Sequence, residues 1–313
     1  MHSVAEKTTA RRKRPLKVVK NTIIFWAVRA AMALLALLPL GVARGVFRAF
    51  GRVASWLPIR ENAIARRNIA AAFPDLDDRA REEIYRDCYR QIGASAGEAV
   101  KIAMSGRKTT GLVSWAPGAR ETVEAVLADG TGFVWITGHV GNWELMAMFV
   151  AEQGYPVNTI AKESYDPRFT ELIRRHREAR GVHCIWKGDP NIKEKIIGVF
   201  LGGGMLGFLM DQDTKVPGVF ADFFGREAFT PSMPAKIVAQ AGIPVIAGFI
   251  HRQPDDTHVL SARRLDCTVP EGADPVLHLT TVFNAAIESE IRAHPSEWVW
   301  MHARWKTRPP KDQ

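Results

Sequence analysis

A histidine and a carboxylate five positions apart, His139 and Glu144, have the clearest catalytic potential in this sequence. Histidine titrates near neutral pH, and a nearby carboxylate can fix its tautomer and stabilise the imidazolium formed when it accepts a proton. Within one regular helix the two would point about 140° apart, so we expect His139 in a turn and Glu144 in the first turn of the next helix. Gly138 and Gly141 permit that turn. The pair therefore predicts a general base, His139, oriented by Glu144.

Alternating apolar runs and helical stretches should position this pair. Such alternation predicts an α/β domain with a central, at least partly parallel sheet. The expected strands cover residues 133–137, 157–161, 182–186, 205–210 and 243–250. One expected helix starts near residue 143, and three others cover residues 166–180, 191–199 and 233–241. His139 and Asp211 each follow an expected strand, at the sheet edge where open α/β sheets tend to build their sites.

Helical spacing of apolar residues also predicts an amphipathic helix over residues 77–103, with Asp77 and Asp78 at its start. The chain has 313 residues, of which 47% are hydrophobic, enough for a core of ordinary size. We therefore expect one large domain with an appendage. The three cysteines are far apart and lack metal-ligand spacing, so they read as reduced thiols.

The appendage is an amino-terminal membrane anchor. Six basic residues fall between positions 11 and 20, and residues 21–43 are almost wholly apolar apart from Arg29. A full span needs about 20 apolar residues, and Arg29 at its centre would cost roughly 2.5 to 3.5 kcal/mol. A shallow or re-entrant anchor therefore competes with a full span. Basic residues on both flanks leave the orientation open.

The formal net charge of +9 indicates an anionic partner. No zinc-finger spacing or aromatic RNA-binding signature is present, so nucleic acid is not expected. Lipid headgroups, an acidic carrier protein and a phosphorylated substrate all suit that charge. There is also no Gly-x-Ser-x-Gly elbow and no cysteine near the strand end, which favours activation of a substrate group by His139 over a covalent intermediate on the protein.

Several motifs together resemble those of the bacterial lipid A biosynthesis acyltransferases, from about residue 26 onward. The carrying segments are WAVR (26–29), RRNI (66–69), GHVGNWE (138–144), DQD (211–213), GVFADFFG (218–225) and PSEWVWMH (295–302). The resemblance implies a glycerolphosphate acyltransferase-like fold, with a mixed, partly parallel sheet flanked by helices and a membrane-anchoring helix. It divides the chain into a basic tail (1–20), an anchor (21–43) and an acyltransferase domain (44–313).

The resemblance also implies roles for residues that periodicity alone does not single out. Arg177, rather than Arg174 or Arg175, matches the family's active arginine, as a phosphate binder or a stabiliser of the thioester oxyanion. Asp211 and Gln212 are expected to orient substrate. No metal site is expected there, because no further ligands accompany the DQD motif. Ordinary core packing competes with acyl-chain binding at an aromatic pair, Phe223 and Phe224.

As a member of this family, the chain is expected to transfer a fatty acyl group from acyl carrier protein to a hydroxyl of a lipid A precursor, without a cofactor. It would act at the cytoplasmic face of the inner membrane and bind the anionic lipids there. One alternative is an acyl-CoA-dependent glycolipid acyltransferase of the phosphatidylinositol mannoside type. The other is a non-catalytic peripheral protein that binds acidic lipid.

Overall fold

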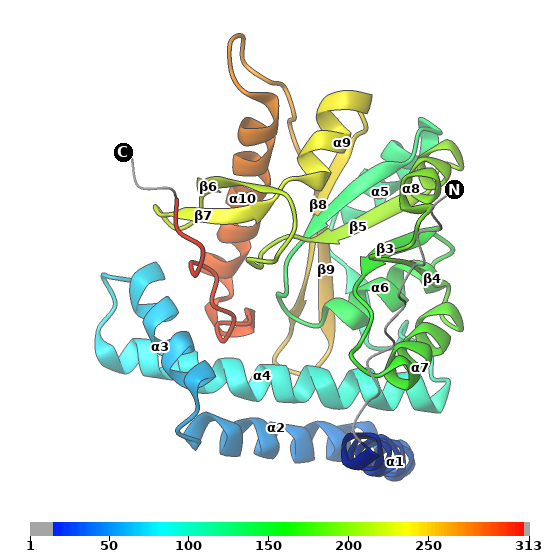
Figure 1. Cartoon of the computed structure of the whole chain (residues 1–313), viewed down its shortest axis with the longest axis vertical. Coiled ribbons are helices and arrows are strands. Elements are labelled where there is room, and N and C mark those ends of the chain that lie inside the picture. The colour runs from blue at the N-terminus through cyan, green and yellow to red at the C-terminus, as the bar shows by residue number, and fades with distance from the viewer. Residues whose placement is uncertain (1–14, 310–313) are drawn as a thin grey trace, which may run out of the picture.

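A seven-stranded mixed sheet forms the centre of the computed structural model, which describes residues 15–309 (Figure 1). The strand order is β1-β9-β8-β2-β5-β3-β4. The β8 and β9 pair is antiparallel and the other neighbouring pairs are parallel. The strands are β1 (Val113–Trp115), β2 (Phe133–Thr137), β3 (Val157–Ala161), β4 (Val182–Trp186), β5 (Met205–Leu209), β8 (Val245–Arg252) and β9 (His258–Arg264). The predicted fold, an α/β domain with a partly parallel sheet, is confirmed.

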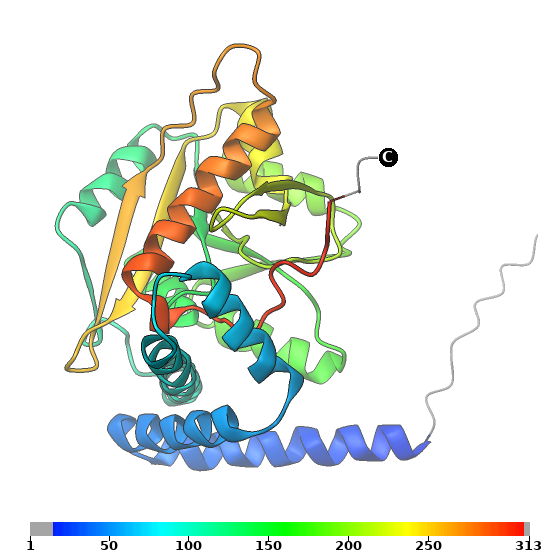
Figure 2. The same cartoon turned by 90° about the vertical axis from the view of Figure 1, so that its left-hand side faces the viewer.

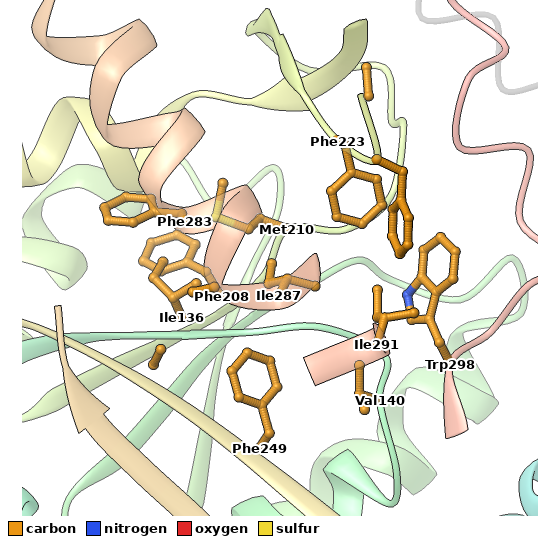
Figure 3. Close-up of a cluster of buried hydrophobic side chains, with 14 of the residues drawn as sticks. Ile136, Val140, Phe208, Met210, Phe223, Phe249, Phe283, Ile287, Ile291 and Trp298 are labelled. Atoms are coloured by element: carbon orange, nitrogen blue, oxygen red, sulfur yellow. The ribbon is translucent and has the colours of Figure 1, made fainter. Parts of the chain in front are cut away.

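Helices cover both faces of the sheet, which explains why its central strands read as continuous apolar runs. Every residue of β2 is buried, and its side chains alternate between two cores. Val134 and Ile136 join one core, whereas Phe133 and Trp135 join the other. Figure 3 shows part of the first core, where Ile136 and Phe208 of the sheet lie beside Phe283 and Ile287. The covering helices are α5 (Ala119–Ala128), α6 (Trp143–Glu152), α7 (Pro167–Glu178), α8 (Ile192–Leu201), α9 (Met233–Ala241) and α10 (Pro275–Ala293).

The predicted strands near the site match the observed bounds closely. Those at 133–137, 157–161 and 182–186 coincide with β2, β3 and β4. The strand expected from residue 243 begins instead at Val245, because Pro244 has no N–H to donate to a sheet ladder. A two-stranded hairpin, β6 (Gly218–Asp222) and β7 (Glu227–Pro231), lies apart from the main sheet. A short 3₁₀ helix, η1 (Pro295–Glu297), follows α10.

The apolar amino-terminal stretch forms two helices rather than one. α1 (Pro15–Leu37) ends shortly before Pro39, and α2 (Leu40–Trp56) begins directly after this proline. Proline is common at the start of a helix because its φ is fixed. α3 (Arg60–Ala72) and α4 (Asp78–Ser105) follow. The side chain of Asp77 caps the start of α4, where the sequence predicts that this helix begins. Residues 1–14 of the expected basic tail lie outside the described residues.

The two amino-terminal helices relate differently to the body. α2 packs closely on α4: a Cβ at Gly51 would lie 2.1 Å from the Tyr89 carbonyl oxygen, and one at Gly93 would lie 2.3 Å from that of Phe47. α2 is therefore built into the domain. α1 remains largely exposed, and its segment Val18–Leu37 is long and apolar enough to cross a membrane. Both helices lie along the same side of the molecule, below α4 (Figures 1 and 2).

Candidate active site

The catalytic candidate His139 lies in the turn between β2 and α6, as the sequence predicts. Its ring nitrogen Nδ1 lies 2.8 Å from Oδ1 of Asp211, and its backbone N–H donates to Oδ2 of the same carboxylate at 2.8 Å. Asp211 follows β5, which pairs in parallel with β2. The two residues therefore meet because adjacent parallel strands end at the same edge of the sheet.

The partner of His139 differs from the one expected. Glu144 does begin α6, but its carboxylate is bound by the guanidinium of Arg177: Nε donates to Oε2 at 3.1 Å and Nη2 donates to Oε1. In the structure Asp211, not Glu144, is therefore hydrogen-bonded to the imidazole. A five-residue spacing across a turn brings Glu144 near the histidine, whereas Asp211 reaches the ring itself from the neighbouring strand.

Further contacts hold the His139–Asp211 pair in place. The indole Nε1–H of Trp298 donates to Oδ2 of Asp211 at 2.7 Å. Gly141 has a φ of 61° and lies so close to Ile250 that a Cβ would come within 1.8 Å of the Ile250 carbonyl oxygen, so only glycine fits this position in the turn. Trp298, which belongs to the PSEWVWMH segment near the end of the chain, thus orients the carboxylate.

A second buried network fixes the start of α6. The side chain of Asn142 accepts a hydrogen bond from the backbone N–H of Leu145 at 3.2 Å and donates to Glu98 of α4 at 2.9 Å. Glu98 is fully buried and also binds Arg44, Arg252 and His258. These cationic and polar partners outweigh the effect of burial and hold the pKa of the Glu98 carboxyl well below its usual range. Sequence reasoning missed this network, because its members are far apart along the chain.

The charges of the pair stabilise each other. Burial by itself lowers the pKa of His139, but the charge and hydrogen bond of Asp211 outweigh it, so the pKa lies above its ordinary value of 6.5. Burial raises the pKa of Asp211, yet the charge of His139 and the hydrogen bonds from His139 and Trp298 lower it to about 2. In neutral imidazole, the Nδ1 contact places the ring proton on Nδ1 and leaves the lone pair on Nε2. This arrangement is that of a general base with its orienting carboxylate.

His139 borders a cavity of about 750 Å³ at the carboxyl ends of the central strands. This volume lies in the usual range for small-molecule sites. Apolar side chains from several elements dominate the walls: Trp143, Ile160, Ile173, Val182, Trp186, Ile192, Phe208, Leu209, Met210, Val216, Met233 and Ile237. Cationic side chains also line it: Lys162, Arg177, Lys187 and Lys236. The cavity thus combines space for an apolar chain with charges that suit an anionic group.

Most of the predicted site residues meet at this cavity. His139, Glu144, Arg177 and Gln212 line it, and Asp211 lies directly behind the histidine. On α7, Arg177 faces the cavity, while Arg174 forms ion pairs with Glu171 and Glu178 of its own helix and Arg175 pairs with Glu171. The structure thus separates Arg177 from its neighbours, as the family resemblance implies.

The aromatic pair Phe223 and Phe224 does not reach the cavity. Both residues are buried in the first core, where Phe223 contacts Trp298 and Trp305 and Phe224 contacts Phe73. Their prediction as substrate-binding residues is therefore wrong, and the competing explanation, core packing, is correct. Aromatic density in a sequence does not reveal which side of a β-hairpin faces the core.

One group of possible metal ligands lies away from the cavity lining within the described residues: His251, His294 and Glu297. The two imidazole rings stack with centroids 3.6 Å apart and planes 20° apart. Their in-plane lone pairs therefore do not converge on one point, and His251 Nε2 already contacts Glu290 at 2.8 Å. We assign no metal to this group.

Asp213, the second acid of the DQD motif, accepts hydrogen bonds from Thr307 in the carboxyl-terminal segment.

Residues 10–307 match the family described as bacterial lipid A biosynthesis acyltransferase. The match covers nearly the whole chain, so the protein belongs to this family and is an acyltransferase. Membership excludes the alternative of a non-catalytic peripheral protein that binds acidic lipid.

The chain is similar to three curated mycobacterial proteins. The chain is 25% identical to a phosphatidylinositol mannoside acyltransferase of Mycobacterium tuberculosis (strain CDC 1551 / Oshkosh), over 94% of this chain and 92% of the relative. The protein of the same description from strain ATCC 25618 / H37Rv gives the same values. A third, from Mycolicibacterium smegmatis, is 22% identical over 58% of this chain and 59% of the relative.

Proposed function

We propose that this acyltransferase moves a fatty acyl chain from an acyl carrier protein thioester to a hydroxyl of a lipid A precursor. One observation carries the proposal: a histidine with an orienting carboxylate, His139 and Asp211, faces a largely apolar cavity with cationic side chains. The description of the matched family supplies the acceptor class.

His139 acts as the general base in this reaction. Its Nε2 accepts the proton of the acceptor hydroxyl while that oxygen attacks the thioester carbonyl carbon. The resulting tetrahedral intermediate collapses by breaking the carbon–sulfur bond, and His139 returns the proton to the leaving thiolate. Acyl ester and free thiol are the products. Asp211 stabilises the imidazolium between the two proton transfers, and such base catalysis is worth about 10²- to 10⁴-fold in rate.

Arg177 and Glu144 shape the field around the reacting atoms. Burial lowers the pKa of Arg177, but the charge and hydrogen bonds of Glu144 outweigh it, so the pKa rises above its ordinary value and the guanidinium stays charged. The guanidinium forms an ion pair with Glu144 and lies at the wall of the cavity that His139 also lines. We assign Arg177 to stabilisation of the oxyanion, with Glu144 as the residue that positions it.

The cationic wall of the cavity suits phosphate groups on acceptor or donor. Burial and the neighbouring charge of Lys162 lower the pKa of Lys187, as expected where cations gather without enough acids. A bound phosphate would relieve that repulsion. Apolar side chains of the same cavity provide the surface for the acyl chain.

Exposed apolar residues on the two amino-terminal helices support attachment to a membrane. The large exposed apolar side chains of α1 and α2 include Ile23, Ile24, Trp26, Leu34, Leu37, Phe50, Val53 and Trp56. α1 and α2 lie in one layer (Figure 2). A helix lying in the membrane interface would bury such a face. We propose attachment to the inner membrane with the catalytic domain on the cytoplasmic side.

A second candidate acceptor is a phosphatidylinositol mannoside, because the mycobacterial relatives are described as acyltransferases of that lipid. In this alternative we take acyl-CoA as the donor. Mass spectrometry of lipid A from a strain lacking the gene distinguishes the two. Loss of one acyl chain supports the lipid A precursor as acceptor. Unchanged lipid A removes it in favour of another glycolipid.

A donor comparison with the purified protein completes the test. We expect transfer from acyl carrier protein thioesters to exceed transfer from acyl-CoA at equal concentration. The opposite preference would contradict the carrier protein as donor. It would leave the base assignment intact, since His139 acts on the acceptor in either case.

A further inference from the structure

A second, strongly cationic pocket lies outside the active-site cavity. It has a volume of about 250 Å³ and is bounded by α3, the β6–β7 hairpin and the carboxyl-terminal segment. The residues that line it are Arg60, Arg67, Asn68, Arg226, Ala303, Trp305, Lys306 and Arg308. Five of these eight are cations, and no acid is among the described residues of its lining. Such a concentration of like charge is unfavourable unless an anion accompanies it.

Buried contacts fix the framework on which these cations stand. The side chain of Asn68 donates to the backbone oxygens of Trp300 and His302, at 2.9 and 2.8 Å, and so joins α3 to the carboxyl-terminal segment. The fully buried Arg304 joins the same segment to β7 by donating to Phe229 O and Thr230 Oγ1. The pocket is therefore a built feature and not a chance gathering of mobile side chains.

The cations themselves face the same concavity. Arg60 and Arg67 are seven residues apart on α3, which places them on one face of the helix, two turns apart. Arg226 stacks over Trp305 with 4.9 Å between its guanidinium carbon and the ring centroid. No described acidic side chain forms an ion pair with Arg60, Arg67 or Arg308. Guanidinium groups with free N–H donors match the geometry of a phosphate.

The position of the pocket indicates the source of that phosphate. Arg60 begins α3 directly after an exposed apolar stretch at the end of α2, which includes Trp56, Leu57 and Ile59. α3 rises from the layer formed by α1 and α2, with the carboxyl-terminal segment beside it (Figure 2). A membrane in contact with that layer would place its phosphates at the level of Arg60.

We propose that this pocket binds the phosphate of an anionic phospholipid headgroup. The volume of about 250 Å³ holds a headgroup and leaves the acyl chains outside, against the exposed apolar residues of α2. The pocket is separate from the acyl-transfer site, because the two linings share no residue. Lys306, which lines the pocket, donates to Asp213 O, next to Gln212 of the catalytic cavity. The proposal does not depend on the identity of the acyl donor or acceptor.

Binding to the full-length protein in neutral detergent micelles tests it. Dioleoyl phosphatidic acid is titrated into the micelles, with dioleoyl phosphatidylcholine and inorganic phosphate as comparison ligands. The double variant R60Q/R67Q should weaken the apparent affinity for phosphatidic acid about 30-fold, equivalent to roughly 1 kcal/mol for each arginine. The charge-matched control R79Q/R120Q changes two exposed arginines of α4 and α5 and should bind as wild type does.

Two outcomes would overturn the proposal. Equal affinities of R60Q/R67Q and the control would show that the pocket is not the binding site, and R308Q gives an independent check at the carboxyl-terminal segment. Displacement of the lipid by inorganic phosphate at similar concentration would assign the pocket to a soluble phosphate ligand. Selective loss in R60Q/R67Q and R308Q, without competition by free phosphate, supports the headgroup site.

Discussion

Replacing Asp211 by asparagine should remove most of the acyl transfer while the fold is retained. Asparagine keeps the shape of the side chain, and its amide oxygen can still accept one hydrogen bond from His139 or Trp298. The negative charge is lost, however, and with it the stabilisation of the imidazolium. The structure lowers the pKa of Asp211 from 3.8 to about 2, a shift equivalent to roughly 2 kcal/mol. A loss of that order predicts a fall in kcat of tens of fold, and loss of base catalysis sets a limit of about 10⁴-fold.

The pH dependence of kcat/KM gives this prediction a sign. His139 must be neutral to accept a proton, so activity rises with pH through its pKa, which Asp211 raises above 6.5. In Asp211→Asn the raising charge is absent while burial still favours neutral imidazole. The acidic limb of the profile should therefore move to lower pH, even though the maximal rate falls.

The chain offers a matched control two residues away. Asp213 is also buried, but it binds Thr307 and Lys306 rather than the histidine. Asp213→Asn should lower the midpoint of thermal unfolding and leave kcat within about threefold of wild type. The assay is transfer of a labelled acyl chain from the thioester to extracted lipid in detergent. The reasoning is refuted if Asp211→Asn retains wild-type kcat and Glu144→Gln alone shifts the acidic limb.

Three further changes test other parts of the account. Arg177→Ala should lower kcat at least tenfold with little change in acceptor KM. Arg175→Ala should change neither value by more than about twofold, because Arg175 is a solvated surface residue. Equal effects of the two substitutions would show that Arg177 has no special role in the reaction. Deletion of residues 1–37 should leave a cooperative thermal transition but shift much of the protein from the membrane to the soluble fraction, and aggregation even in detergent would show that α1 belongs to the core. Asn142→Ala should destabilise the protein by about 2 kcal/mol in denaturant unfolding, because it removes a helix cap and one partner of buried Glu98; an unchanged midpoint would contradict this.

The sequence predicted the central fold well because the signals there are local. β2 is an uninterrupted apolar run that ends at a glycine, and α7 has the clear spacing of an amphipathic helix. α2 was harder to interpret, because its first four residues continue the apolar stretch of α1 and its arginines resemble the basic flank of a membrane anchor. Only the close approach of Gly51 and Gly93 to the facing backbones shows that it belongs to the domain.

Most of the predicted site residues lie at the cavity, but Phe223 and Phe224 do not, and the partner of His139 was not predicted. His139 and Asp211 were both expected at strand ends, yet their contact depends on β2 and β5 being neighbours, and strand order is not written in local periodicity. The nearer acid in the sequence, Glu144, was the obvious partner for that reason. The contact from Trp298 was likewise hidden, since it joins positions 87 residues apart.

The most direct test of the central claim is the rate of acyl transfer by purified His139→Ala. General base catalysis by this residue predicts at least a 100-fold fall in kcat. Asp211 keeps its hydrogen bonds from Trp298 and from the backbone N–H of position 139, so the variant should remain folded, which a cooperative thermal transition would check. Transfer by the variant at a near wild-type rate would contradict the account.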